Sequence, residues 1–339
     1  MIYLDNNATT QPSPQVVEAM LPYLNECYFN PSSSTAAFTG ADVPRRMAAD
    51  ALAKLLNAEE PDCFSFTSGA TESNNWVFSS ITKSCRTGTV LISAIEHASI
   101  AEPAAELARR GFKVIELLVD QQGLLQLDAL HDALDKEVVL VSVMAANNET
   151  GVLQPLQEIG QIIRKRSPAA LFHTDATQTI GKVKVDLQGD WQEIDLASFS
   201  AHKFHGPKGI GGLYIRPGVE IQPLLLGGGQ EEGRRSGTTN TPGLAGLAVA
   251  TTEWDSVSAQ SIAGLRDHFE VELKMRFPEV RIHSAGVRRL PNTSCFSLPG
   301  AVGEDLAATL AIQGIIVGTG SACSSGTIHP PQDSIGHEC

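Results

Sequence analysis

The sequence predicts an α/β protein in which a mostly parallel sheet of seven strands is covered by helices. Short apolar runs of strand length alternate along the chain with stretches in which apolar residues recur at helical spacing. The apolar runs show little polar alternation, which is typical of parallel strands that are buried on both faces. Because ligands bind beyond the carboxyl ends of such strands, we expect functional residues directly after strands.

The order of the elements supports two structural units. The expected strands are residues 63–67, 89–93, 113–119, 138–144, 170–175, 194–200 and 211–215, and the expected helices between them are 71–80, 100–110, 127–135 and 156–165. A glycine-rich, charged stretch, residues 227–243, is interpreted as a long loop. After it, a helix over 244–275 and short strands at 280–283, 294–298 and 315–317 predict a smaller second domain.

Composition excludes several classes of protein. The chain has 339 residues with 25 Lys and Arg against 38 Asp and Glu, and its net charge of −13 argues against nucleic acid or an anionic membrane as partner. No apolar run reaches the roughly 18 residues of a membrane span, and the N-terminus lacks the features of a secretory signal. The six cysteines lack metal-binding spacing, so we expect no metal and a reducing, cytoplasmic setting. The usual ATP and NAD signatures are also missing.

A first candidate site follows the first expected strand. Residues 65–73 run from that strand through Gly69 and Ala70 to Thr71 at the start of a helix. Free backbone N–H groups and the helix dipole make such a position suitable for a phosphate. The alternative is that Ser68 or Thr71 is simply a helix cap.

An acid and a lysine follow two later strands. Asp175 ends a buried strand, where a carboxylate is costly unless it meets a cation such as a protonated pyridine nitrogen. Lys203 follows another strand, beside hydroxyls and a histidine, and is suited to forming a Schiff base with an aldehyde. Together with the phosphate loop, this combination indicates pyridoxal phosphate (PLP). A capping role for Asp175 and a surface role for Lys208 are the alternatives.

Two further residues are candidates for catalysis. His97 follows the strand at 89–93, and its imidazole is able to stack on the cofactor ring and to shuttle protons, although a structural histidine is the alternative. Cys323 lies in a run of glycines and serines, a setting that suits an accessible nucleophilic thiolate better than a buried core cysteine.

These motifs together resemble a known family. The chain resembles the class V aminotransferases among the fold type I PLP-dependent enzymes, and within them the cysteine desulfurases of the NifS/IscS group. The stretches that match are 3–10, 67–73, 96–97, 147–151, 175–178, 200–209, 235–238 and 320–324, in family order. The resemblance implies a large PLP-binding domain over residues 16–248 and a small domain formed by 1–15 with 249–339.

The resemblance also implies a role for each matching residue. Lys203 binds PLP as a Schiff base, Asp175 pairs with the pyridine nitrogen, and Gln178 bonds the phenolic oxygen. His97 stacks on the ring. The implied phosphate ligands are Ala70, Thr71, Ser200, His202 and, from the neighbouring subunit of a homodimer, Thr238. The residues implied near the substrate are Asn148, which also approaches the phenolic oxygen, and Asn30.

The reaction implied is the removal of sulfur from L-cysteine. Cys323 attacks the substrate sulfur, becomes a persulfide and leaves L-alanine, and the sulfur passes to an iron–sulfur scaffold or to tRNA thiolation.

Two departures from the family motivate other hypotheses. Residues 34–40 differ from the family pattern, and Pro44 follows where a helix is due to begin. The C-terminus is shorter than the family's and lacks the arginine of a Ser-x-Arg-x-Ser segment that pairs with the substrate carboxylate. One alternative is therefore an impaired member that acts as a binding protein or remnant. The other is a different class V enzyme, such as a cysteine or selenocysteine lyase, which does not need Cys323.

Overall fold

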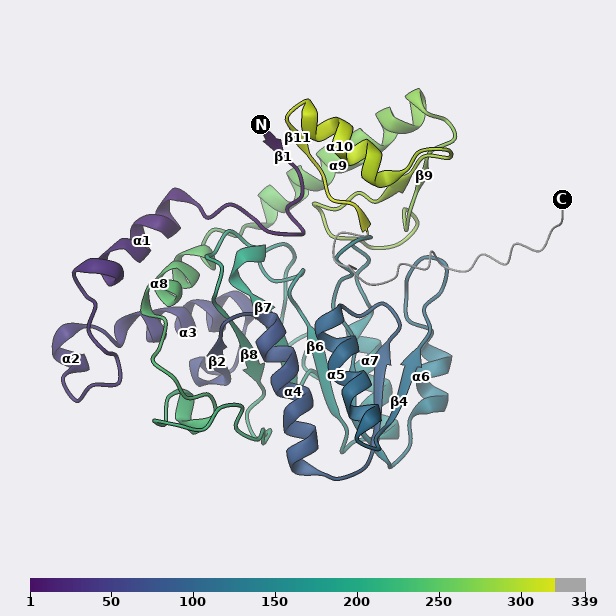
Figure 1. Cartoon of the computed structure of the whole chain (residues 1–339). Helices are drawn as coiled ribbons and strands as arrows, with labels where there is room; N and C mark the ends of the chain where they lie inside the picture. The colour runs from purple at the N-terminus through teal and green to yellow at the C-terminus, as the bar shows by residue number, and fades with distance from the viewer. Residues whose placement is uncertain (321–339) are drawn as a thin grey trace.

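A computed structural model describes residues 1–320, and its centre is a seven-stranded sheet in the order β2-β8-β7-β6-β5-β3-β4 (Figure 1). The strands are β2 (Phe64–Thr67), β3 (Thr89–Ser93), β4 (Lys113–Leu117), β5 (Val138–Ser142), β6 (Leu171–Asp175), β7 (Leu196–Ser200) and β8 (Gly211–Ile215). All seven predicted strands are present, with ends that differ from the prediction by at most two residues. The α/β class and the mostly parallel sheet are confirmed.

One reversed strand decides where the strand ends meet. Strand β8 pairs antiparallel with both β2 and β7, whereas every other pairing in the sheet is parallel. The other six strands therefore run in one direction, and their carboxyl ends lie along one edge. That edge is where an α/β sheet binds its ligands.

Helices cover both faces of the sheet. The helices of this part are α1 (Pro14–Asn25), α2 (Ala36–Thr39), α3 (Val43–Leu56), α4 (Ala70–Ser84), α5 (Ala98–Arg109), α6 (Leu127–Ala133), α7 (Leu156–Arg166) and α8 (Thr241–Ala250). Helices α4 and α5 pack on one face with Val90 and Ile92, whereas α3, α6, α7 and α8 pack on the other with Leu91. Neighbouring residues of β3 thus face opposite cores, as the period of a strand requires.

A smaller group of elements lies above the sheet in Figure 1. It contains β1 (Ile2–Tyr3), α9 (Ser256–Arg276), β9 (Arg281–Ile282), β10 (Phe296–Ser297), α10 (Gly303–Ile312) and β11 (Ile315–Ile316). Strand β1 pairs in parallel with β11, which brings the N-terminus next to residues more than 300 positions away. The division into domains at 15/16 and 248/249 stays a prediction.

The single helix predicted over 244–275 is wrong. The chain forms α8 and α9, separated by residues 251–255. Asp255 begins the second helix, because its carboxylate accepts hydrogen bonds from the backbone N–H groups of Val257 and Ser258, both at 2.8 Å. Such a cap satisfies N–H groups that lack partners within the helix.

The predicted loop at 227–243 is anchored to the body of the protein. Glu231 and Glu232 have φ values of 50° and 58° and form a left-handed turn, and Thr241 already begins α8. The Glu231 carboxylate pairs with Arg45 at 3.1 Å and accepts from the backbone N–H of Phe66 at 3.1 Å.

Pro44 does not disturb α3, because it lies in the first turn, where its missing N–H costs nothing.

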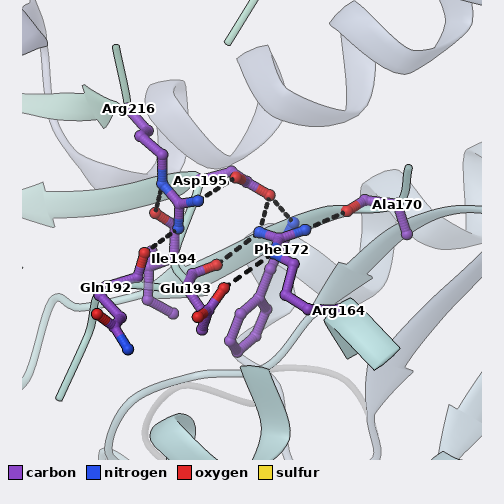
Figure 2. Close-up of polar contacts among 8 residues, drawn as sticks. All are labelled: Arg164, Ala170, Phe172, Gln192, Glu193, Ile194, Asp195 and Arg216. Carbon is purple, nitrogen blue, oxygen red and sulfur yellow. Dashed lines mark hydrogen bonds and ion pairs between the residues drawn. The ribbon is translucent and has the colours of Figure 1, made fainter. Parts of the chain in front are cut away.

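A cluster of ion pairs stabilises the edge of the sheet opposite the strand carboxyl ends (Figure 2). Asp195, which directly precedes β7, accepts from Arg164 at 2.6 Å and from the backbone N–H of Phe172 at 2.7 Å, and Arg216 lies 3.4 Å from its other oxygen. Arg164 also donates to the carbonyl of Ala170 at 3.0 Å. The cluster therefore joins α7 to β6, β7 and β8.

No helix within residues 1–320 combines the length and the apolar character that crossing a membrane requires.

We expect Asp195→Ala to lower the free energy of unfolding by about 3–5 kcal/mol, because it leaves two arginines without their shared carboxylate. Urea unfolding followed by circular dichroism measures this change. Glu106, which pairs with Arg109 and Arg110 at the surface, offers a matched control, since Glu106→Gln removes two exposed ion pairs and is expected to have little effect. An equal loss of unfolding free energy in the two variants would contradict a stabilising role for the Asp195 cluster.

Candidate active site

The predicted site residues gather at the carboxyl edge of the sheet. His97 follows β3, Asp175 ends β6, and Ser200 ends β7. Lys203 ends the short 3-10 helix that follows β7 (Ala201–Lys203). The residues that the sequence predicts as functional therefore lie at or just after the ends of strands, and their roles stay predictions.

The turn between β2 and α4 forms a cradle for an anion. A cavity of about 260 Å³ is lined there by residues that include Ala70, Thr71, Ser200, His202 and Lys208. The backbone N–H of Ala70 donates to the Ser200 hydroxyl at 2.7 Å, which joins the start of α4 to the end of β7. The cavity thus combines a helix N-terminus, hydroxyls and a lysine, which suit a phosphate. Glu72 also lines it, and its carboxylate is paired with Arg235 at 2.7 Å.

The cradle requires a glycine on the neighbouring strand. A Cβ atom added at Gly211 would lie 2.3 Å from the carbonyl oxygen of Phe199 and 2.7 Å from the Cα of Gly69. Only a residue without a side chain lets the β2–α4 turn approach the sheet this closely.

His202 is held in its neutral form. Burial lowers its pKa to about 4, and the charges of Lys203, Lys208 and Lys182 act in the same direction. Its Nδ1 lies 3.1 Å from the Thr9 hydroxyl. At neutral pH the ring is therefore a hydrogen-bonding group and not a cation.

The N-terminal segment lies over the predicted lysine. Lys203 Nζ donates to the carbonyl oxygens of Asn7 at 2.7 Å and Ala8 at 2.8 Å. Gln178 Nε2 donates to the same Asn7 oxygen at 2.9 Å, and the Asn7 side chain donates to the carbonyl of Asn148 at 3.0 Å. Asn7 therefore connects three of the predicted residues, although the sequence matched its segment without giving it a role.

Lys182 is a second amine beside Lys203 that the sequence analysis missed. It is 9% exposed, and its Nζ donates to Gln178 Oε1 and, at 3.4 Å, to Asn7 Oδ1. Burial, together with the charge of Lys203, lowers its pKa to about 7. Gln178 and Lys182 lie in the turns that follow β6, so no helical or strand pattern in the sequence indicates their contact.

Asp175 is buried but not isolated. It is 5% exposed, and its oxygens accept from the Asn74 amide at 2.8 Å and from the backbone N–H of Thr177 at 3.0 Å. Beside it, His173 is fully buried between the hydroxyls of Ser142 and Ser198, at 2.8 and 2.9 Å. Burial lowers the pKa of His173 to about 4, against the opposing effect of Asp175, so His173 is neutral.

Glu96 is a further, half-buried acid at this edge. Its Oε1 accepts from the Ser93 hydroxyl at 2.6 Å and from the backbone N–H of Met144 at 2.7 Å. Its Oε2 is buried and has no hydrogen-bond partner within residues 1–320. Burial raises the pKa of Glu96 to about 8, and the charge of Asp175 adds to the rise, so this carboxyl is protonated at neutral pH.

His97 begins helix α5. Its Nδ1 accepts from the backbone N–H of Ser99 at 3.1 Å and lies 2.8 Å from the Ser99 hydroxyl. The ring also lines a groove of about 620 Å³ between α4 and α5 that reaches Thr71. One edge of the imidazole is therefore fixed by the helix, and the ring borders open space next to the anion cradle.

Three predicted residues are not joined to this group. Asn30 is exposed, and its side chain accepts from Ser32 in its own loop, at 2.9 Å. Thr238 is also exposed and lies outside both cavities. Cys323 lies outside the described residues.

The residues present fit PLP. The donor set offers an amine, an anion cradle and a buried carboxylate, which match the aldehyde, the phosphate and the ring nitrogen of that cofactor. The buried atoms Asn74 Oδ1 and Glu96 Oε2 have no hydrogen-bond partner within residues 1–320. This edge of the sheet therefore has polar atoms that other groups of the described chain do not satisfy. No cluster of metal-ligating side chains is present in the same part of the chain.

Comparison with known proteins agrees with this geometry. The family model "Aminotransferase class-V" matches residues 2–334. The chain belongs to the class-V aminotransferase family. A cysteine desulfurase IscS of Clostridium botulinum is 40% identical over 336 residues, covering 97% of this chain and 83% of the relative. One from Methanosarcina thermophila is 41% identical, covering 97% and 81%.

Solved structures support the same branch of the class-V family. A NifS-like protein matches with a TM-score of 0.87 and 40% identity, covering 94% of this chain and 87% of the other. SspA in complex with cysteine matches with a TM-score of 0.82 and 31% identity, covering 95% and 90%. These likenesses confirm the fold type I architecture and place this class-V member among the cysteine desulfurases.

We expect Glu96→Gln to change how stability depends on pH. Because the pKa of Glu96 is raised from 4.5 to about 8, the folded protein keeps a proton that the unfolded chain releases between these values. The wild type therefore loses stability as the pH rises through this range, by an amount on the order of 3 kcal/mol, and the variant does not. Urea unfolding between about pH 5 and pH 8 measures this difference, and parallel pH profiles contradict it.

Lys182→Met is expected to remove a pH dependence of opposite sign. Because the pKa of Lys182 is lowered from 10.5 to about 7, the unfolded chain binds a proton that the folded protein lacks between these values. The wild type thus gains stability as the pH rises from about 7 to 10.5, and the variant is expected to have a flatter profile there. Lys184→Met, a change at an exposed lysine, serves as the control. An unchanged slope in Lys182→Met argues against a neutral buried amine.

Proposed function

We propose that this class-V family member is a PLP-dependent cysteine desulfurase that converts L-cysteine to L-alanine. The observation that supports this most directly is the meeting of Lys203, Asp175 and the anion cradle at one edge of the sheet. The neighbour SspA, which was solved in complex with cysteine, supports the choice of substrate.

Each part of the proposed cofactor site has a counterpart in the contacts. Ala70, Thr71, Ser200 and His202 line the cavity that is proposed to hold the phosphate. Asp175 would face the ring nitrogen, and Gln178, which uses one of its two amide N–H groups on Asn7, would offer the other to the phenolic oxygen. When bound through Lys203, PLP supplies an electron sink that weakens bonds next to the substrate's α-carbon.

The remaining residues would position the substrate and accept its sulfur. Asn7 holds the segment that carries Asn148, which is proposed to lie near the substrate carboxylate. His97 is proposed to stack on the ring. The Cys323 thiol is proposed to bond to the substrate sulfur as its bond to carbon breaks, so that L-cysteine and a thiol give L-alanine and a persulfide. The protons balance without an added oxidant or reductant.

The proposed assembly is a homodimer in the cytoplasm. Thr238, exposed on its anchored loop, would reach the phosphate of the neighbouring subunit, and Asn30 would border the substrate pocket. The IscS relatives favour an iron–sulfur scaffold or another sulfur acceptor as protein partner. The cysteines described, Cys27, Cys63, Cys85 and Cys295, are free thiols, which favours a reducing compartment.

The direct test is the visible spectrum of the purified protein with PLP, followed by addition of L-cysteine and measurement of alanine. We expect a cofactor band that changes with cysteine, and alanine as product. Lys203→Ala is expected to lose the band and to lower alanine formation by a factor of about 100 or more, because the cofactor loses its covalent attachment. Lys184→Ala, at an exposed lysine, is the control.

The same assay separates the other hypotheses. A cofactor band without alanine indicates a member that keeps the site but not the reaction, whereas the absence of a band with added PLP contradicts the proposal altogether. Full sulfur release by Cys323→Ala would instead favour a lyase.

A further inference from the structure

Four polar side chains form a continuous chain of hydrogen bonds between the two residues proposed to contact the cofactor ring. Asp175 Oδ2 accepts from Asn74 Nδ2 at 2.8 Å, and the same nitrogen lies 2.8 Å from Ser99 Oγ. Ser99 Oγ in turn lies 2.8 Å from His97 Nδ1. Asp175, Asn74 and Ser99 are all buried, so water does not compete for these contacts.

The chemistry of the side chains and the backbone N–H of Ser99 together fix the direction of these bonds. A carboxylate accepts, so Asn74 presents its amide nitrogen to Asp175, and the second N–H of that nitrogen points to Ser99. The oxygen of Ser99 is then an acceptor, and its hydrogen is free to be donated to His97 Nδ1. The backbone N–H of Ser99 donates to the same ring nitrogen at 3.1 Å.

This direction determines the tautomer of His97. Two donors meet at Nδ1, so the lone pair is on that nitrogen and the proton of the neutral ring is on Nε2. A neutral ring of this kind donates from Nε2 and is not able to accept a proton there. Nε2 is therefore the nitrogen from which His97 is able to donate a proton, and the shuttle role expected from the sequence stays a prediction.

The position of Asn74 leaves one of its polar atoms without a partner. Asn74 is fully buried, and its Oδ1 has no hydrogen-bond partner within residues 1–320. An unpaired buried acceptor is unfavourable, and a hydrophobic residue of similar shape avoids the penalty. An asparagine in this position is explained if its two N–H donors serve the site.

We propose that Asn74 and Ser99 are positioning residues that couple Asp175 to His97 and hold His97 as the Nε2–H tautomer. This inference rests on the proposed function, because it is the cofactor ring that would lie between Asp175 and His97. The hydrogen bonds that carry the coupling are formed by the chain itself, so the coupling can be measured in protein without cofactor.

The test is a double-mutant cycle read by NMR on cofactor-free protein with ¹⁵N-labelled histidines. The proteins compared are the wild type, Asp175→Asn, Ser99→Ala and the double variant, and His97→Gln identifies the His97 signals. We expect the wild-type ring to show the Nε2–H pattern, and Asp175→Asn to shift the Nδ1 signal. In the Ser99→Ala background that shift is expected to vanish, because the connection is broken.

Ser99→Thr, which keeps the hydroxyl, is the matched control and is expected to preserve the coupling. An Nδ1–H pattern in the wild type, or the same shift with and without Ser99, overturns the inference. In the loaded protein, Ser99→Ala is expected to lower kcat about 3- to 10-fold with little change in KM, and Ser99→Thr to restore it. If the wild type never binds PLP, the proposed function fails while the NMR result still decides the coupling.

Discussion

The burial of the Asp175 carboxylate at the end of β6 is the constraint around which the site is organised. A carboxylate removed from water is costly unless donors surround it, and Asn74 and the backbone of Thr177 supply two. Both titratable neighbours, His173 and Glu96, are neutral at pH 7, with pKa values of about 4 and about 8. Neither neighbour therefore adds a charge beside Asp175, the group that would meet a cationic ring nitrogen.

The two edges of the sheet differ in how their buried polar groups are paired. At the edge away from the site, Asp195 is shared by two arginines and a backbone N–H, which is an arrangement with charges matched inside the protein (Figure 2). At the carboxyl edge, donors and acceptors such as Asn74 Oδ1 and Glu96 Oε2 have no partner within residues 1–320. Unmatched polar groups at one edge and matched ones at the other are what a binding site on a stable scaffold requires.

The sequence predicted the sheet well because strands buried on both faces are continuous apolar runs, as in β3 and β8. It also predicted the positions of His97, Asp175 and Lys203, since each follows such a run. It did not predict the break between α8 and α9, which depends on one capping aspartate, Asp255. Contacts of Asn7 with Lys203 join residues almost 200 positions apart, and no local pattern reports them.

The local charge around the site differs in sign from the net charge of the chain. The chain as a whole carries −13, yet Lys182, Lys203 and Lys208 all act on His202 in the anion cradle. A long polyanion meets the negative field of the whole surface, whereas a phosphate or carboxylate compound small enough to enter the cavity meets Lys208, and the Glu72 carboxylate that also lines it is paired with Arg235. Because His202 and, near pH 7, part of the Lys182 population are neutral, repulsion among the positive charges around the cradle is reduced. Local lysines and a negative surface together favour small anionic ligands.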